Sequence, residues 1–254
     1  FTLEFKKSAL KDVGFKYRER VLLVQALKAL GKERVDDAVI ATLRKQLATE
    51  LEDALRGRVL YARGRTYDYQ GRWHEAIATF ERMLAGGPAI DQAKAWKHIA
   101  ISYRNGFAQG DFGPSALRQA GDYCRRALAA LAGSGEPFEK IAWLTGSIWN
   151  TLGAIAMNLA QWDEAIDCYS RDIAICRSLG DEYGIAVSTL NLGEIYHRRS
   201  PASWSESGAA YLAALAAFRT FDDPYLAADT LANLALLRRD QGERAAALGY
   251  YQQA

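Results

Sequence analysis

The chain has 254 residues, 50% of them apolar and 24% charged, which is the composition of a globular protein with one or two domains. It has no apolar run long enough to cross a membrane, no signal-like start, and three cysteines without a paired framework, so we expect a cytoplasmic rather than a membrane or secreted protein. The net charge is only +2, but residues 1–106 hold 20 Lys and Arg against 13 Asp and Glu, which favours an acidic partner, while the pI of 8.4 argues against nucleic acid.

Residues 1–56 show helical periodicity but no repeat. Two stretches, 15–30 and 35–55, carry apolar side chains at helical spacing, the second at Val39, Leu43, Leu47, Leu51 and Leu55. Gly31 and Lys32 would join the two helices in a turn. We therefore expect an N-terminal helical hairpin that either caps the following domain or is a degenerate first repeat. A coiled-coil arm is the alternative.

The stretch over residues 60–88 combines small and bulky residues at fixed spacings. Gly64 precedes Tyr67 by three residues, Ala76 precedes Phe80 by four, and Pro88 closes the unit. Small residues let two helices approach closely, and aromatic rings fill the groove between them. The stretch resembles a tetratricopeptide repeat, whose register is W-x2-L-G-x2-Y, then A-x3-F, then P.

Further copies follow along the chain. The second begins at Trp96, and its two helices are expected to be separated by a long loop over Asn105–Pro114. The matching residues of the later copies are Trp149, Gly153, Ala165 and Tyr169, then Gly193, Tyr196, Ser207 and Tyr211, and finally Leu231, Ala235, Ala247 and Tyr251. We expect repeats at 57–90, 93–132, 146–180, 186–222 and 228–254. The resemblance implies an all-α fold, a right-handed α-solenoid of about five helix-turn-helix units with an N-terminal helical hairpin.

The repeats are longer than the usual period of about 34 residues. Ala165, Ser207 and Ala247 occupy equivalent positions and are 42 and 40 residues apart. This spacing resembles the long-repeat subgroup of the family, which includes kinesin light chains, LGN-type adaptors and the sensor regions of bacterial STAND and transcriptional regulators. Because the chain opens on Phe1 and stops inside a helical pattern, we expect it to be a piece of a longer protein.

Signatures of an enzyme or a metal site are absent from the sequence. There is no Gly-rich phosphate loop ending in Gly-Lys-Ser/Thr, no His-Glu-x-x-His and no Gly-x-Ser-x-Gly. No His or Cys stands at metal-ligand spacing from another, and Cys168 and Cys176 are two helical turns apart. We therefore expect no catalytic residue, no metal and no cofactor.

The resemblance implies that the first helix of each pair lines an inner wall where such proteins bind their partners. Transferring the family register to this sequence predicts partner-binding residues Arg65, Tyr69, Lys94, Lys97, Arg104, Asn150, Asn158, Asn191, Glu194, Arg198 and Asn233. Cationic groups can hold carboxylates, and Asn side chains can clamp an extended peptide backbone. Lys97 is followed by Ile101 instead of the Asn that a chaperone-binding carboxylate clamp needs, which argues against that ligand.

The sequence thus predicts a non-enzymatic protein-interaction scaffold that binds an extended, acidic peptide or a partner domain. The alternative is a sensor or regulatory segment of a larger bacterial signalling protein, such as a STAND ATPase or transcription regulator, which would bind an effector or the protein's own other domains. In neither case is a membrane expected as a partner.

Overall fold

The computed structural model describes residues 56–254, and within this part of the chain every regular element is a helix. The hairpin helices expected between residues 15 and 55 lie outside the described residues. Among the helices that are described, none combines the length and the apolar character needed to cross a membrane.

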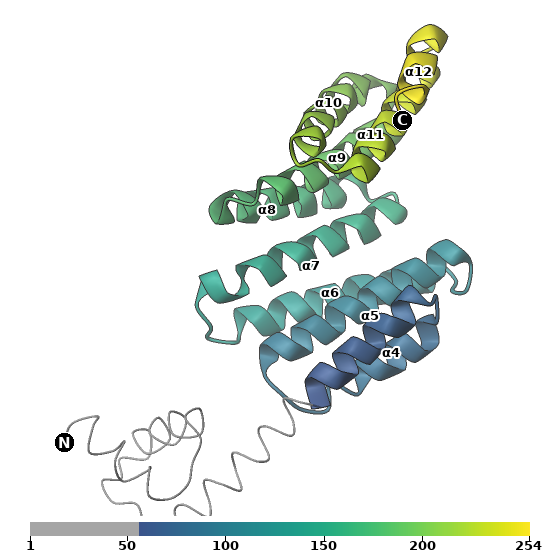
Figure 1. Ribbon diagram of the computed structural model, residues 1–254. Coiled ribbons are helices and arrows are strands. Elements are labelled where there is room, and N and C mark those ends of the chain that lie inside the picture. Colours follow the sequence, from purple (N-terminus) through teal and green to yellow (C-terminus); the bar gives the residue numbers. More distant parts are fainter. Residues whose placement is uncertain (1–55) are drawn as a thin grey trace, which may run out of the picture. The chain divides into compact units, whose positions relative to one another are not determined.

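The helices follow one another as antiparallel pairs (Figure 1). The pairs are residues 56–69 with α4 (Trp73–Glu81), α5 (Ala89–Gln109) with α6 (Ser115–Ala132), α7 (Phe138–Asn158) with α8 (Trp162–Leu179), α9 (Glu182–Arg199) with α10 (Trp204–Thr220), and α11 (Pro224–Asp240) with α12 (Arg244–Tyr251). A short 3-10 helix, η1 (Pro201–Ser203), leads into α10. The expected all-α, right-handed solenoid of about five helical units is therefore confirmed.

The first, third and fourth pairs close through a glycine on the first helix and an aromatic ring on the second. A Cβ added at the glycine would collide with the ring, so only glycine allows the observed approach of the helices. The contact recurs between Gly64 and Phe80, where the Cβ would lie 2.5 Å from the ring, between Gly153 and Tyr169 (2.9 Å), and between Gly193 and Tyr211 (2.7 Å). The three rings are fully buried, which is the packing expected from the sequence register.

The stack has an inner and an outer side. Successive first helices contact one another, α5 with α7, α7 with α9, and α9 with α11. In the described part of the chain the backbones of the second helices lie farther apart, although Arg125 on α6 and Glu164 on α8 form an ion pair at 3.3 Å. The first helices therefore lie closer together and form the inner wall, and polar side chains on that wall are the candidates for function.

The expected long loop over Asn105–Pro114 is wrong. The α5 helix continues to Gln109 and ends at Gly110, whose φ of 86° is left-handed. The extra turn is stabilised because Phe107 packs against the core formed by α5, α6 and α7, and Gly106 leaves room for the ring of Phe112. The added length of this repeat is thus mostly helix. Similarly, α7 begins at Phe138, before residue 146 where the third repeat was expected to start.

Candidate functional site

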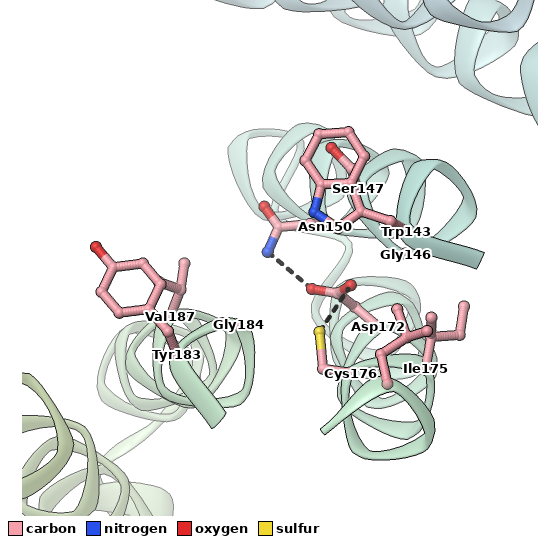
Figure 2. A pocket seen from close by; sticks show the side chains of 11 residues that line it. Trp143, Gly146, Ser147, Asn150, Asp172, Ile175, Cys176, Tyr183, Gly184 and Val187 are labelled. Carbon is pink, nitrogen blue, oxygen red and sulfur yellow. Dashed lines mark hydrogen bonds between the residues drawn. The ribbon is translucent and has the colours of Figure 1, made fainter. Parts of the chain in front are cut away.

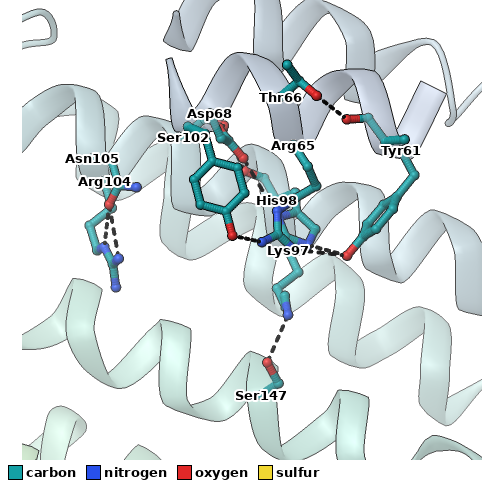
Figure 3. A network of polar contacts seen from close by, with 12 residues as sticks. Tyr61, Arg65, Thr66, Asp68, Lys97, His98, Ser102, Arg104, Asn105 and Ser147 are labelled. Carbon is teal, nitrogen blue, oxygen red and sulfur yellow. Dashed lines mark hydrogen bonds and ion pairs between the residues drawn. The ribbon is translucent and has the colours of Figure 1, made fainter. Parts of the chain in front are cut away.

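Three cationic side chains on the first two inner helices form what we call the basic cluster, namely Arg65, Lys97 and Arg104 (Figure 3). Lys97 and Arg104 are seven residues apart on α5, so they occupy one face of the helix. Lys97 is only 7% exposed, and its Nζ donates a hydrogen bond to Ser147 Oγ on α7 at 2.9 Å. Burial lowers the pKa of Lys97 to about 8.

Arg104 is also largely withdrawn from solvent. Its guanidinium donates to Oδ1 of the neighbouring Asn105, at 3.0 Å from Nη2 and 3.3 Å from Nε. Burial lowers the pKa of Arg104, although the Tyr169 and Cys124 side chains nearby act in the opposite direction. Within residues 56–254, no carboxylate forms an ion pair with Arg65, Lys97 or Arg104. A buried cation without a counter-ion is unfavourable, so this arrangement suits an incoming anion.

The third member, Arg65, is oriented by two tyrosines on its own helix. Its Nη1 donates to Tyr61 Oη at 3.3 Å and its Nη2 donates to Tyr69 Oη at 3.0 Å. The guanidinium carbon lies 5.3 Å from the centre of the Tyr69 ring, and that ring is 82% exposed. Arg65 is therefore held at the surface by neutral groups, and its charge remains available to a ligand.

A polar network lies behind the basic cluster. Asp68 Oδ1 accepts a hydrogen bond from Ser102 Oγ at 2.5 Å, and His98 Nε2 is 3.1 Å from Tyr61 Oη. Burial raises the pKa of Asp68 to about 6 and lowers the pKa of His98 to about 3, although the two side chains approach to 3.9 Å. At neutral pH His98 is uncharged, so Asp68 provides one negative charge against the three positive charges of the cluster.

A cavity of about 240 Å³ opens between the N-terminal half of α7, the C-terminal half of α8 and the start of α9. Figure 2 shows Ser147 and Asn150 on α7, Asp172 and Cys176 on α8, and Tyr183 on α9 arranged around this space. Ser147 also accepts the hydrogen bond from Lys97, so the cavity borders the basic cluster. We call it the Asp172 pocket.

Asp172 is the charged group of this pocket and is only 4% exposed. Its Oδ2 accepts hydrogen bonds from Ser188 Oγ at 2.5 Å and Asn150 Nδ2 at 3.1 Å. Asn150 Nδ2 also lies 2.9 Å from Ser188 Oγ. Burial raises the pKa of Asp172, and these hydrogen bonds partly counteract that effect.

The remaining predicted site residues are spread along the inner wall. Lys94 pairs with Asp91 at 2.9 Å, and Arg198 pairs with Glu194 at 3.1 Å, so these charges are neutralised locally. The four predicted Asn side chains differ in their surroundings. Asn150 forms hydrogen bonds inside the Asp172 pocket, and Asn158 is exposed at the end of α7. Asn191 on α9 and Asn233 on α11 are half-buried. The structure places Arg65 and Lys97 close enough for their charges to interact, Arg104 lies about two turns farther along α5, and the others lie on separate turns or helices.

Sequence reasoning missed Asp172 and left Trp143 without a role. A signal for Asp172 exists, because it follows Cys168 and Tyr169 at helical spacing in the buried stripe of α8, where a carboxylate is unusual. Trp143 stands at 65% exposure on α7, at the rim of the Asp172 pocket, and the Lys97 ammonium lies 5.4 Å from its ring. No repeat position indicates this role.

The cysteines do not form a reactive site. Cys124, Cys168 and Cys176 are free and buried, and burial raises the pKa of each thiol to about 12. Such thiols stay protonated and are poor nucleophiles. Across residues 56–254, no group of three His, Cys, Asp or Glu side chains is placed to hold a metal ion.

Comparison with protein families finds the tetratricopeptide repeat at residues 59–89, 149–183 and 230–254. These ranges fall on the first, third and fifth helix pairs. The matched ranges leave out the second and fourth pairs, whose helices are joined by residues 110–114 and by η1. A comparison with curated proteins gives no match.

Three examples of solved structures with a similar arrangement of helices follow. A Rap protein complexed with competence and sporulation factor has a TM-score of 0.63 at 15% identity, covering 97% of this chain and 67% of that one. Kinesin-light-chain TPR-like repeats of P. anserina give 0.59 at 16% identity, covering 77% and 91%. A STAND protein with a tetratricopeptide-repeat sensor from Pyrococcus horikoshii gives 0.56 at 14% identity, covering 78% and 29%.

At these identities the likeness concerns the fold alone. Together with the three matched segments and the recurring contact between glycine and an aromatic ring, it agrees with the register first seen around Gly64 and Phe80. The chain carries tetratricopeptide repeats at residues 59–89, 149–183 and 230–254, and its fold resembles that of kinesin-light-chain-like repeats and of a STAND protein with a tetratricopeptide-repeat sensor.

Proposed function

We propose that this chain is a non-enzymatic scaffold whose inner wall binds an extended segment of a partner protein, and that the basic cluster receives an acidic side chain of that segment. Tetratricopeptide repeats generally serve as protein-interaction scaffolds, and the proposal adds the chemistry of the ligand. Chemical function depends on specific sites rather than on the fold, so the proposal rests on the inner-wall residues.

One observation supports it above all others. Lys97 is a buried cation and Arg104 a half-buried one, and their side-chain hydrogen bonds go to neutral groups, Ser147 and Asn105. Burying an ammonium or guanidinium group without a counter-ion lowers the stability of the fold. A carboxylate that enters beside them would supply the missing charge with charge-assisted hydrogen bonds.

The amides farther along the wall suit the rest of such a segment. Asn191 on α9 and Asn233 on α11 are half-buried. An Asn side chain offers both a donor and an acceptor, which matches the alternating groups of an extended peptide backbone. We therefore expect the acidic residue to bind at α5 and the following backbone to run toward α11.

The reactive groups on the wall favour binding over catalysis. His98 has its pKa lowered to about 3 and stays neutral and buried, and the thiols stay protonated. A general base needs a pKa near the working pH and access to the substrate. Asp68 and Lys97 have pKa values of about 6 and about 8, but both side chains are largely withdrawn from solvent and are bonded to Ser102 and Ser147. We propose that no residue of the described part performs chemistry.

A regulatory role within a larger protein is the second candidate. The likeness to a STAND protein with a tetratricopeptide-repeat sensor favours it, and this chain corresponds to 29% of that protein. A cavity of about 240 Å³ could accept a small effector. A nucleotide-binding or DNA-binding region encoded beside this segment in the full gene would support this candidate.

Binding of a defined acidic peptide tests the first proposal. The probe is an acetyl-capped hexapeptide of alternating Ala and Glu, compared by calorimetry with its Ala and Gln counterpart. We expect the Glu peptide to bind more tightly, and Lys97→Met or Arg104→Met to weaken it at least about tenfold, the equivalent of about 1.4 kcal/mol.

Arg219→Met is the matched control, because Arg219 is an exposed arginine on the second helix α10. It should leave binding unchanged. Equal affinity for the Glu and Gln peptides, or undiminished binding by both Met variants of the basic cluster, would contradict the proposal.

A further inference from the structure

The Asp172 pocket contains a buried carboxylate that has no cationic partner among residues 56–254. Ser188 and Asn150 satisfy Oδ2, whereas Oδ1 is approached only by the Cys176 thiol, at 3.7 Å. A thiol is a weak donor, so Oδ1 keeps most of its capacity to accept hydrogen bonds. A carboxylate in this position would gain from a strong cationic donor.

Two glycines keep space open beside this carboxylate. A Cβ added at Gly146 would lie 2.7 Å from Asp172 Oδ1, and one added at Gly184 would lie 2.7 Å from Cys176 Sγ. Any larger residue at either position would therefore press on the acceptor or on its thiol neighbour. Glycine at these two positions lets α7 and α9 approach Asp172 and Cys176 on α8 closely, and all four residues line the pocket.

Apolar and aromatic groups form the rim of the pocket. Trp143, Tyr183 and Leu179 are 65%, 39% and 42% exposed, so a ligand can reach them from solvent. The Tyr183 hydroxyl donates to Asp223 Oδ2 at 2.8 Å, which holds the phenol ring in place. The Trp143 ring already has the Lys97 ammonium at 5.4 Å, a distance at which an aromatic face attracts a cation.

Of the charges beside the pocket, Asp181 favours a cation and Lys97 opposes one. Asp181 is close enough to affect the ionisation of Asp172, and its own side chain accepts from the backbone N–H of Gly184 at 2.8 Å. Lys97, the cation of the neighbouring cluster, is held by Ser147 and forms no ion pair with Asp172. A buried negative charge inside an apolar and aromatic rim is complementary to a positive group on an aliphatic stem.

We propose that the Asp172 pocket binds the ammonium or guanidinium group of a Lys or Arg side chain, with Asp172 Oδ1 as acceptor and Trp143 and Tyr183 packing along the aliphatic stem. The assignment of this side chain to the same partner segment rests on the proposed function. Ser147 joins the pocket to the basic cluster, so the segment would present a basic residue close to its acidic one. A free aliphatic amine has the same chemistry and would occupy the same pocket.

Titration of the ¹⁵N-labelled 254-residue chain with three small probes tests this site. The probes are acetyl-Gly-Lys-Gly-amide, the same tripeptide with norleucine in place of Lys, and n-butylamine. We expect the Lys tripeptide to shift the amide resonances of Gly146 and Gly184, and the norleucine tripeptide to bind at least about tenfold more weakly. Binding of n-butylamine with equal affinity would indicate a small-amine site; clearly tighter binding of the Lys tripeptide would indicate a peptide site.

Two variants probe the pocket by different means. Asp172→Asn removes the charge at similar volume and should weaken the Lys tripeptide at least about tenfold. Leu179→Lys, a change at an exposed rim position, places an ammonium group beside Asp172 and should compete with the probe. Leu248→Lys is its control, because Leu248 is 58% exposed on α12, away from the pocket.

The proposal is overturned if norleucine binds as well as Lys, or if Leu179→Lys and Leu248→Lys leave binding equally intact. The Leu179 comparison keeps the test decisive even if Asp172→Asn fails to fold. If Lys97→Met no longer binds the acidic hexapeptide but still binds the Lys tripeptide, the two peptides occupy separate subsites. If the acidic hexapeptide does not bind but the Lys tripeptide does, the proposed function is contradicted and the cation site in the Asp172 pocket is supported.

Discussion

Burial is the main cause of the shifted pKa values among the inner-wall residues. Lys97, with a pKa lowered to about 8, is 7% exposed, and its ordinary value is 10.5. Because the unfolded chain binds this proton more tightly, the fold is destabilised at neutral pH by keeping Lys97 charged. Asp68 and His98 are shifted in opposite directions by the same cause. Under the proposed function, an anionic ligand beside Lys97 would offset part of this cost.

The shifted pKa of Lys97 predicts a pH dependence of binding. The ammonium is present below about pH 8 and is lost as the pH rises through that value. Affinity for the Ala and Glu hexapeptide should therefore fall between pH 7 and pH 9, measured by calorimetry. In Lys97→Arg the guanidinium stays charged throughout, so the decline should be smaller. A wild-type affinity that stays constant over this range would show that Lys97 does not contact the anion.

At the scale of single elements, the contact between glycine and an aromatic ring decides how closely a helix pair closes. Gly153 on α7 and Tyr169 on α8 illustrate it, because the ring is fully buried against the position where a Cβ would lie. A glycine also meets an aromatic ring in the first pair, at Phe80, and in the fourth, at Tyr211. Local spacing in the sequence is sufficient to predict this contact, since both partners belong to one repeat.

Substituting this glycine should destabilise the fold. Gly153→Ala would put a Cβ 2.9 Å from the Tyr169 ring, and such overpacking costs about 1–3 kcal/mol. Gly249→Ala on α12 is the control, because nothing lies within 4 Å of its Cβ position and alanine favours a helix by up to about 1 kcal/mol. Urea unfolding followed by circular dichroism measures both. Equal stability of the two variants would mean that the close approach at Gly153 is relaxed in solution.

At the scale of the whole described domain, each helix contacts its own partner and its immediate neighbours. Stability in such a stack is a sum of local contributions and nearest-neighbour interfaces. The helices contribute unequally to this stability. Buried residues occur along most of α7, whereas α12 has one buried residue, Ala247. Local opening should therefore start at α12 and reach α7 last.

Hydrogen exchange of the 254-residue chain measures this order. We expect amides of α12 to exchange at least about tenfold faster than those of α7, because a difference of about 1.4 kcal/mol in opening free energy produces a tenfold ratio. The solvent-facing ring of Tyr251, at 46% exposure, provides little protection. Uniform exchange across the two helices would show that the stack opens as one cooperative unit.

The sequence alone determined the helix pairs and their packing residues, because tetratricopeptide contacts such as Gly64 with Phe80 lie within one short repeat. The same register predicted Arg65, Lys97 and Arg104 as inner-wall candidates. Only the tertiary structure decided where α5 ends, since that depends on Phe107 packing against other helices. It also decided the character of Asp172, because the desolvation of a carboxylate depends on which residues of α7 and α9 cover it.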